Sequence, residues 1–189
     1  MREFVAEVQA AIAGASSPED ACTAVEPRFA ELLADSDWLP DEYQAAASES
    51  GMGGGIGQWL LYRADDRSLS LFSLVVPPGS ETPIHDHLAW GLVGLYRGTQ
   101  DEEIYAQCDG VLELVEQRSL AAGDFYVLIP PRDDIHRVRT TSAETSVSIH
   151  LLTNDTGCIW RHAWDTPSGQ AGPFRSGYVN VPCEENVNP

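Results

Sequence analysis

The sequence predicts an all-β core with a small helical cap at its N-terminus, in one structural domain of 189 residues. Beyond residue 50, short β-branched and aromatic runs alternate with turn residues, and no long helical pattern separates them. The first 50 residues are rich in alanine and have the period of a helix. Because so short a segment buries too little apolar surface to fold alone, we expect residues 1–50 to cap a core formed by residues 51–189.

Two or three helices are expected in the cap. The first has apolar residues one turn apart, at Phe4, Val8 and Ile12. Ser17 followed by Pro18 is typical of a helix N-terminus, and Pro27 is expected to break or restart this second helix. A third, short helix is expected after Pro40.

Ten short strands are expected beyond the glycine-rich segment 51–57, which marks the boundary between cap and core. Each is bounded by turn residues, and the expected ranges are 58–64, 69–77, 83–97, 102–107, 111–119, 124–130, 134–141, 145–152, 158–164 and 174–181. Such a series without long helices predicts an antiparallel sandwich or barrel. The glycine run follows no strand and opens no helix, so it does not fit a dinucleotide-binding loop.

The charge and composition argue against several classes of function. With 29 acidic and 11 basic residues, the formal net charge is −18, which repels phosphate backbones and anionic lipid headgroups. All the basic residues are arginines, so Schiff-base and phosphate-loop chemistry that depends on lysine is absent. Segment 1–14 has acidic residues and no unbroken apolar run, which predicts neither a signal peptide nor a membrane span. We therefore expect a cytoplasmic protein without nucleic-acid or membrane partners.

Four cysteines, Cys22, Cys108, Cys158 and Cys183, are scattered along the chain. They form no Cys-x-x-Cys pair and no dense pattern, which argues against a disulfide framework or a zinc knuckle. Because free cysteines are commonly buried in protein cores, we expect all four to be reduced packing residues.

Three histidines have the spacing of metal ligands. On a strand, residues two apart share a face, so His85 and His87 can present both imidazoles to one ion while Asp86 points away. Far along the chain, His136 follows a turn, and an antiparallel core can bring its strand beside the first pair. Iron, nickel, copper and zinc all accept such ligands, and three on one side leave the opposite side of the ion open.

The spacing Gly-x5-His-x-His that ends at His87, and the later Pro-x4-His that ends at His136, resemble the two motifs of the cupin superfamily. The resemblance covers roughly residues 58–165 and implies a double-stranded β-helix, or jelly-roll, barrel. Cupins usually carry a glutamate four or five residues after the second histidine, where this chain has Gly91 and Leu92. The expected site therefore has histidine ligands only.

Among three-histidine cupins, segment 83–98 is similar to the metal-binding segment of the cysteine dioxygenase family, and within it to bacterial thiol dioxygenases that act on 3-mercaptopropionate. That resemblance implies non-haem iron(II) held by His85, His87 and His136, although nickel, zinc or copper can occupy such a site in a purified sample. A small thiol acid and dioxygen are the implied partners. The free sheet edges of a cupin also permit a homodimer.

The same resemblance implies roles for residues around the iron. The family has a Ser-x-His-x-Tyr sequence after the last ligand, and here Ser148 and His150 match while Leu152 replaces the tyrosine. Gln58 stands where the mercaptopropionate branch uses a glutamine near the substrate, and Arg161 where it uses an arginine to bind the carboxylate. A guanidinium group suits that role because it matches a carboxylate in two hydrogen bonds.

Other residues compete for these roles. Arg63 is a rival for binding the carboxylate, and Tyr178 is a candidate to supply the missing hydroxyl from elsewhere in the chain. His162 is expected to face away from the site, because neighbouring strand residues alternate between faces. His150 either donates to a ligand and moves a proton or is a buried structural histidine bonded to Ser148.

The expected activity is an iron(II) dioxygenase that oxidises the sulfur of a small thiol acid to a sulfinate. The absence of the family tyrosine leaves a second hypothesis, in which a three-histidine cupin dioxygenase cleaves a carbon–carbon bond of a non-thiol chelating substrate such as a diketone. A third hypothesis is a non-catalytic cupin that keeps its metal only to hold a ligand.

Overall fold

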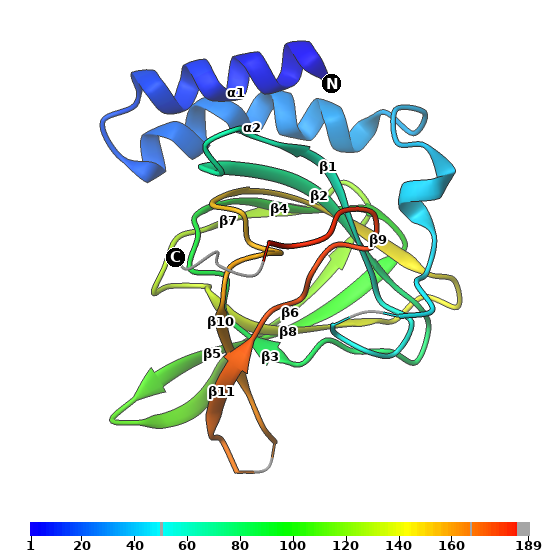
Figure 1. Ribbon diagram of the computed structural model, residues 1–189, viewed down its shortest axis with the longest axis vertical. Helices are drawn as coiled ribbons and strands as arrows, with labels where there is room; N and C mark the ends of the chain where they lie inside the picture. The colour runs from blue at the N-terminus through cyan, green and yellow to red at the C-terminus, as the bar shows by residue number, and fades with distance from the viewer. Residues whose placement is uncertain (50, 167, 185–189) are drawn as a thin grey trace.

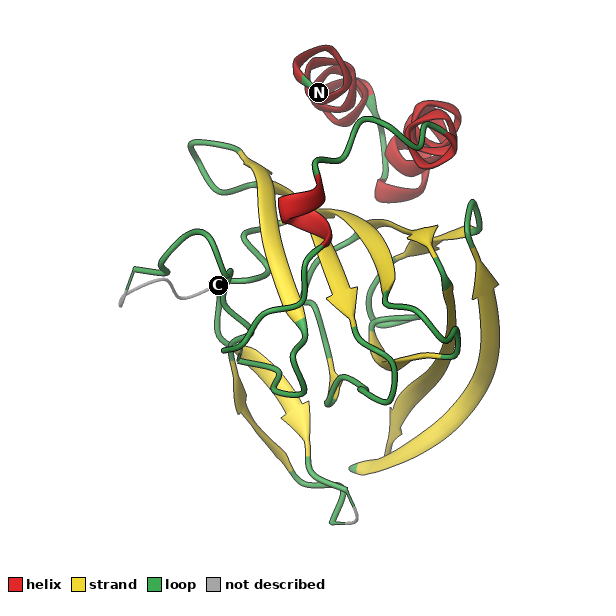
Figure 2. Cartoon of the chain, turned by 90° about the vertical axis from the view of Figure 1, so that its right-hand side faces the viewer, coloured by secondary structure: helices red, strands yellow, loops and turns green. Residues whose placement is uncertain are grey.

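The computed structural model describes residues 1–49, 51–166 and 168–184, and it has two long helices lying against one face of a β-sandwich (Figures 1 and 2). Helix α1 spans Arg2–Gly14, α2 spans Pro18–Ala34, and the short 3-10 helix η1 spans Asp41–Gln44. All three precede the first strand, as expected for the cap. In the described part of the chain, no helix is both long enough and apolar enough to span a bilayer.

The second helix continues through Pro27, so the expected break is absent. Proline has no backbone N–H, which removes one hydrogen bond from the helix. The buried side chains of Phe29 and Leu33 follow Pro27 and belong to the core between helix and sheet, so tertiary packing holds the helix together. The start of the helix is as predicted, because the Ser17 hydroxyl accepts a hydrogen bond from the backbone N–H of Asp20.

The described strands form two antiparallel sheets. The five-stranded sheet has the order β1-β2-β9-β4-β7, and its strands are β1 Gly57–Arg63, β2 Leu69–Val76, β9 Ser146–Thr153, β4 Gly91–Arg97 and β7 Phe125–Leu128. The six-stranded sheet has the order β11-β10-β3-β8-β5-β6, and its strands are β11 Ala171–Phe174, β10 Arg161–Trp164, β3 Ile84–His85, β8 Ile135–Thr140, β5 Thr99–Cys108 and β6 Val111–Ala121. This two-sheet all-β architecture with N-terminal helices confirms the predicted fold class.

The five-stranded sheet separates two different environments. On one face, side chains such as Leu71 and Ile149 join the helices in the main apolar core. On the other face, Tyr126, Val93 and His150 lie opposite one another across β7, β4 and β9, so they share one row. The face that carries this row is the one that holds the polar residues of the site.

Two expected strands differ from the structure. The range expected to be one strand at 83–97 is divided into β3 and β4, because the chain turns at Leu88, which has a φ of +52°. The range expected at 174–181 is not a strand, and β11 ends at Phe174 instead. In both places the β pattern of the sequence is longer than the strand that is paired. Pairing depends on which other strands lie alongside, and the local sequence does not show this.

The expectation that all four cysteines are reduced is wrong for two of them. Cys158 and Cys183 form a disulfide across a sequence separation of 25, whereas Cys22 is free and buried and Cys108 is free and exposed. The spacing rule failed because it detects dense cysteine frameworks, and a single bridge between distant residues leaves no such pattern. The disulfide fastens the C-terminal segment 175–183 to the turn that precedes β10.

Replacing Cys183 with serine is expected to lower the free energy of unfolding by about 2–4 kcal/mol, because the unfolded chain is no longer constrained by the closed loop. Urea unfolding followed by circular dichroism measures this change. The matched control is Cys108→Ser, which removes an exposed free thiol and should leave the midpoint unchanged. Treatment of the wild type with dithiothreitol should lower its stability to that of the variant, and equal stability with and without the reductant would contradict the bridge.

Candidate metal centre

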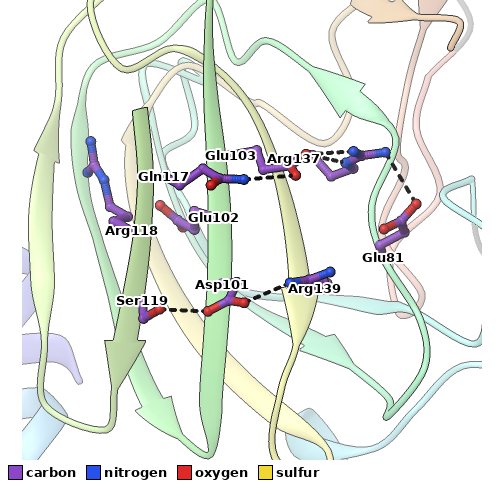
Figure 3. Close-up of a pocket in the computed structure, with 9 residues that line it drawn as sticks. All are labelled: Glu81, Asp101, Glu102, Glu103, Gln117, Arg118, Ser119, Arg137 and Arg139. Carbon is purple, nitrogen blue, oxygen red and sulfur yellow. Dashed lines mark hydrogen bonds and ion pairs between the residues drawn. The ribbon is translucent and has the colours of Figure 1, made fainter. Parts of the chain in front are cut away.

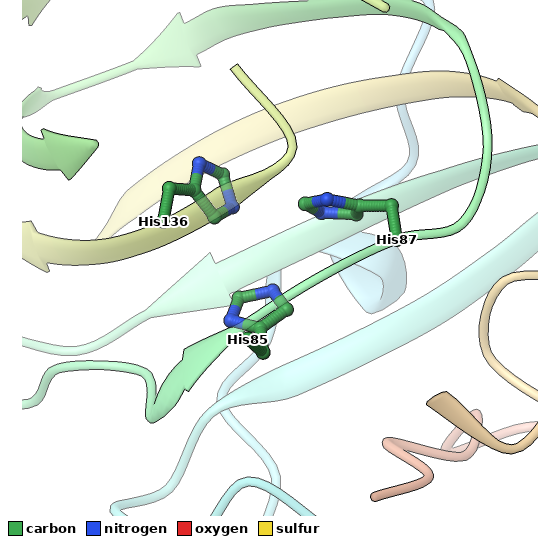
Figure 4. Close-up of side chains that lie close together, drawn as sticks. All are labelled: His85, His87 and His136. Carbon is green, nitrogen blue, oxygen red and sulfur yellow. The ribbon is translucent and has the colours of Figure 1, made fainter. Parts of the chain in front are cut away.

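Three buried histidines meet between the two sheets (Figure 4). The ring centroids of His85 and His87 are 5.0 Å apart, those of His85 and His136 are 4.9 Å apart, and those of His87 and His136 are 4.8 Å apart. One possible ligand atom from each residue lies within 4.8 Å of the others. Among the residues that the structure describes, no carboxylate, thiol or further imidazole joins this group. The trio predicted from the sequence could therefore hold one metal ion.

Strand pairing brings these ligands together. His85 on β3 lies directly opposite His136 on β8, so their side chains share one face of the six-stranded sheet. The chain after β3 is held by Asp86, whose carboxylate accepts a hydrogen bond from the backbone N–H of His162 at 2.7 Å and contacts that residue's Nδ1 at 2.7 Å. Asp86 therefore points away from the trio, as predicted.

Backbone and carboxylate oxygens orient the first two imidazoles. His85 Nδ1 lies 2.9 Å from the carbonyl oxygen of Pro83, and His87 Nδ1 lies 3.2 Å from the carbonyl oxygen of Asp134. The Asp134 carboxylate also accepts a hydrogen bond from the backbone N–H of His87 at 2.8 Å. A ring nitrogen that donates to such an oxygen carries the proton, which leaves the Nε2 lone pair of each ring for a metal.

A tyrosine and a glutamate that the sequence analysis missed lie behind the third imidazole. The Tyr126 hydroxyl is 3.3 Å from His136 Nδ1 and donates a hydrogen bond to Glu102 Oε1 at 3.0 Å. Burial raises the pKa of Glu102 to about 7, although the hydrogen bond from Tyr126 opposes the shift. Burial and the nearby Glu102 raise the pKa of Tyr126, which therefore keeps its proton. The one signal in the sequence was a charged residue at an inward position of β5, between buried Gln100 and Ile104.

The electrostatics around His85 and His136 favour neutral imidazoles. Burial lowers the pKa of His85, and the nearby Arg161 and His87 lower it further. Burial also lowers the pKa of His136, and so do the other two imidazoles. His136 Nε2 is buried and has no hydrogen-bond partner among the residues that the structure describes, which is costly unless another group satisfies it. Three imidazole nitrogen donors and one unsatisfied lone pair fit a divalent transition metal.

The position of the usual cupin glutamate has no room for a side chain. A Cβ atom on Gly91 would lie 2.0 Å from the carbonyl oxygen of Leu151 in the paired strand β9. Leu92 belongs to the apolar core on the helix side of the sheet. Both observations agree with a site that has histidine ligands only.

His150 lies beside the trio, on the opposing sheet. Its ring centroid is 6.3 Å from that of His87, and its Nε2 is 3.0 Å from the Ser148 hydroxyl. Phe72 stacks on the His150 ring at 4.7 Å, and burial lowers the His150 pKa. His150 Nδ1 is buried and has no partner within residues 1–49, 51–166 and 168–184, so it can bind a polar atom of a ligand.

The leucine that replaces the family tyrosine is fully buried. Leu152 packs in one apolar cluster with Phe72 and Tyr178. The hydroxyl of Tyr178, the candidate for the missing group, accepts a hydrogen bond from the backbone N–H of Gly157 at 3.1 Å. That hydroxyl therefore has a structural partner, and the structure shows no contact between it and the histidines.

Arg161 is buried next to the trio, and most of its donors have protein partners. Its guanidinium group donates to the carbonyl oxygen of Thr156 at 3.2 Å, to the carbonyl oxygen of Asp86, and to the Ser176 hydroxyl at 2.8 Å. Those three bonds use three of the five N–H groups of the fork. Burial lowers the Arg161 pKa to about 10, so the group is still charged at neutral pH. The guanidinium carbon also stands 4.6 Å above the Phe174 ring.

The other predicted residues are divided between interior and surface. Gln58 is buried, and its side-chain Nε2 has no hydrogen-bond partner. Arg63, the second candidate for binding the substrate carboxylate, pairs with the buried Asp155 at 3.0 Å, so its charge already has a protein partner. The His162 side chain is 53% exposed and pairs with Asp86, so it faces away from the trio, as predicted.

A second polar region lies on the outside of the six-stranded sheet (Figure 3). It is a hollow of about 180 Å³ in which Arg137 pairs with Glu103 at 2.5 Å and Arg139 pairs with Asp101 at 2.9 Å. Arg137 also pairs with Glu81, whereas Glu102, which lines the hollow as well, is bonded to Tyr126 on the inner side of the sheet. His136 belongs to the opposite face of β8, since its neighbours Arg137 and Arg139 alternate with it and the sheet separates the two regions.

Glu102 is expected to make the metal-free protein less stable as the pH rises. Its pKa is about 7 in the folded state and near the ordinary 4.5 in the unfolded state, so the folded state binds more protons between these values. Stability is therefore full below pH 4.5 and falls by about 3 kcal/mol as the pH rises through 7, and Glu102→Gln removes this fall. Urea unfolding between pH 5 and 8 measures it. Glu103→Gln is the control, since the Glu103 pKa is lowered, and parallel pH curves for Glu102→Gln and wild type would contradict the assignment.

Comparison with solved structures shows similarity to cupin proteins. A Cupin_2 domain of an XRE-family transcriptional regulator from Enterobacter cloacae aligns at 20% identity over 51% of this chain and 94% of that chain, with a TM-score of 0.38. An uncharacterized conserved protein with a double-stranded β-helix domain from Klebsiella pneumoniae aligns at 14% identity over 75% and 99%, with a TM-score of 0.45. Oxalate decarboxylase from Lactobacillus farciminis, solved as a formate complex, aligns at 14% identity over 56% and 31%, with a TM-score of 0.45.

At these identities the likeness concerns the fold only. The chain covers less than a third of the length of the oxalate decarboxylase, so that enzyme's activity is not transferred here. No protein-family model matches the chain. The similarity to the cysteine dioxygenase family remains a prediction from the sequence.

Proposed function

We propose that the protein is a non-haem iron(II) dioxygenase that oxidises a small carboxylate-bearing thiol, such as 3-mercaptopropionate or cysteine, to a sulfinate. The observation that carries the proposal is the meeting of three buried imidazoles, from His85, His87 and His136, beside the buried cation of Arg161. When bound, iron(II) would supply a Lewis-acidic centre for a thiolate and for reaction with dioxygen. The reaction consumes one dioxygen per thiol. Both oxygen atoms go to sulfur, which gives up the four electrons that dioxygen accepts, so no external reductant is needed.

The role of Arg161 is to hold the substrate carboxylate. Two N–H groups of its fork have no partner in the described part of the chain, and a carboxylate can accept both. Gln58 offers a further buried donor, its unpartnered Nε2. In a chain with a net charge of −18, such a local cation is needed to attract an anionic substrate.

The role of His150 is to hold a polar atom of the substrate or of dioxygen. Ser148 engages Nε2, and Phe72 fixes the plane of the ring, so the free Nδ1 has a defined direction. Phe72 and Leu152 make this side of the site apolar, which excludes water from the reacting groups.

Dioxygen uptake by the iron-loaded protein tests the proposal. An oxygen electrode with 3-mercaptopropionate, cysteine and cysteamine compares two thiol acids with a thiol that has no carboxylate. We expect consumption with a thiol acid at one dioxygen per thiol, and slower consumption with cysteamine. The absence of uptake with every thiol would count decisively against the proposal.

Leu152 favours one alternative function. Leu152 packs in an apolar cluster and lacks the tyrosine hydroxyl that the resemblance to thiol dioxygenases implies. The second candidate is therefore a three-histidine dioxygenase that cleaves a diketone. Mass spectrometry of the products separates the two activities. Sulfur oxidation adds the mass of two oxygen atoms to the intact substrate, whereas carbon–carbon cleavage yields fragments.

The metal and the compartment belong to the proposal as well. Three imidazoles also bind nickel, zinc or copper, so elemental analysis of protein isolated from its native cells is needed to identify the ion. We propose the cytoplasm as the compartment. Because disulfides such as Cys158–Cys183 persist mainly in oxidising compartments, recovery of the protein in an extracytoplasmic fraction of those cells would overturn this location.

A further inference from the structure

We infer that Tyr126 and Glu102 form a relay that fixes the tautomer of His136 and so presents its Nε2 atom to the metal. Both are positioning residues, because the structure shows them against the ring nitrogen of His136 that faces away from the trio. The inference rests on the proposed metal site and not on the identity of the substrate.

The direction of the hydrogen bonds carries this inference. The Tyr126 hydroxyl has one proton, and it donates that proton to Glu102 Oε1 at 3.0 Å. Its lone pairs then face His136 Nδ1 at 3.3 Å, so this nitrogen must donate and must carry the imidazole proton. Glu102 Oε1 accepts from tyrosine in the charged form, and also in the neutral form when the carboxyl proton lies on Oε2, so this direction does not require the charged form.

The opposite tautomer would disable the site. If Tyr126 donated to His136 Nδ1, the proton of the neutral ring would lie on Nε2. Nε2 would then have no lone pair with which to bind the metal ion. Glu102 prevents this arrangement, because it claims the only proton that the tyrosine hydroxyl can donate. The other two ligands need no such device, since a carbonyl oxygen can only accept, and His85 and His87 each face one.

The relay is held in place from several sides. Tyr126 lies opposite Val93 in the pairing of β7 with β4, and the guanidinium carbon of Arg118 stands 4.6 Å above its ring. Arg118 in turn pairs with Asp133 at 3.0 Å. Glu102 is almost fully buried, and no described residue bonds to its Oε2. A buried carboxyl group with an unsatisfied oxygen is costly, which is typical of a group retained for a functional reason.

The experiment reads the tautomer and the metal affinity separately. Long-range 1H–15N spectra of the metal-free protein, labelled with 15N-histidine, identify which nitrogen of His136 carries the proton. Titration with Co2+ as the probe gives the dissociation constant. We expect the Nδ1–H tautomer in the wild type, a gain of the Nε2–H tautomer in Tyr126→Phe, and a 10- to 100-fold higher dissociation constant for that variant, on the order seen when such partners are removed.

Conservative and unrelated variants separate orientation from general damage. Glu102→Gln keeps an oxygen that accepts from Tyr126 and should retain the wild-type tautomer and affinity, whereas Glu102→Leu should lose both. Tyr96→Phe is the matched control, because Tyr96 is a buried tyrosine whose hydroxyl donates to the carbonyl oxygen of Ser36 on the helix side of the sheet. Circular dichroism checks that each variant is folded. If Glu102→Leu is unfolded, the test depends on Tyr126→Phe alone, which loses a single oxygen atom.

Two results would overturn the inference. One is an unchanged His136 tautomer and Co2+ affinity in Tyr126→Phe. The other is an equal loss of affinity in Tyr96→Phe, which would show that any lost buried hydroxyl weakens the site. Neither readout involves dioxygen or a thiol, so the relay can hold even if no thiol is oxidised, and thiol oxidation can hold even if the relay fails.

Discussion

Replacing His87 with alanine is expected to weaken the binding of a divalent metal by a factor on the order of 1,000 and to abolish dioxygen uptake. Only two imidazoles of the trio then remain, and no described carboxylate or thiol lies close enough to replace the third. Anaerobic titration with Fe2+, or with Co2+ as a spectroscopic probe, measures the affinity. The matched control is His162→Ala, because His162 is the half-exposed histidine that faces away from the site.

The fold should survive the loss of His87. The main apolar core lies between the helices and the five-stranded sheet, on the far side of that sheet from the trio, so the metal is not needed to bury it. We expect the metal-free variant to unfold within about 1 kcal/mol of the metal-free wild type. Retained tight binding in His87→Ala, or an equal loss in His162→Ala, would show that the trio is not the metal site.

Local spacing predicted the ligands because strand geometry converts sequence spacing directly into direction. Side chains two residues apart on a strand share one face, and this rule predicted that His85 and His87 lie together. They do lie together, although β3 ends at His85 and His87 belongs to the segment after the strand. The arrival of His136 needed a further assumption about strand pairing, which the direct pairing of β3 with β8 satisfies. The same rule predicted that Asp86 and His162 point away, and their mutual contact explains why both do.

The parts that could not be predicted depend on contacts between distant segments. Nothing near Glu102 or Tyr126 in the sequence indicates that β5 and β7, in different sheets, bring them together behind His136. The Cys158–Cys183 bridge likewise joins two isolated cysteines. Pro27 shows the converse, because a strong local signal for a helix break was overridden by packing.

Replacing Arg161 with methionine is expected to lower kcat/KM for a thiol acid about 100-fold, mainly through KM. Two charge-assisted hydrogen bonds to a carboxylate contribute about 3 kcal/mol, which corresponds to that factor. The rate with cysteamine, which has no carboxylate, should change little. Steady-state dioxygen uptake with both thiols measures the ratio, and Arg161→Lys should recover only part of the loss, since an ammonium group keeps the charge without the planar fork.

The ratio between the two thiols is the decisive quantity because Arg161 also holds the protein together. Its donors satisfy the carbonyl oxygens of Asp86 and Thr156, so the methionine variant loses stability as well, by about 1–3 kcal/mol for each unsatisfied oxygen. Such damage, or a displacement of His87, which follows Asp86 in the chain, lowers the metal content. The activity then falls with both thiols. A loss confined to the thiol acid, at full metal occupancy, identifies carboxylate binding. If Arg63→Met gave that selective loss instead, the carboxylate would belong to the rival arginine, which the structure pairs with Asp155.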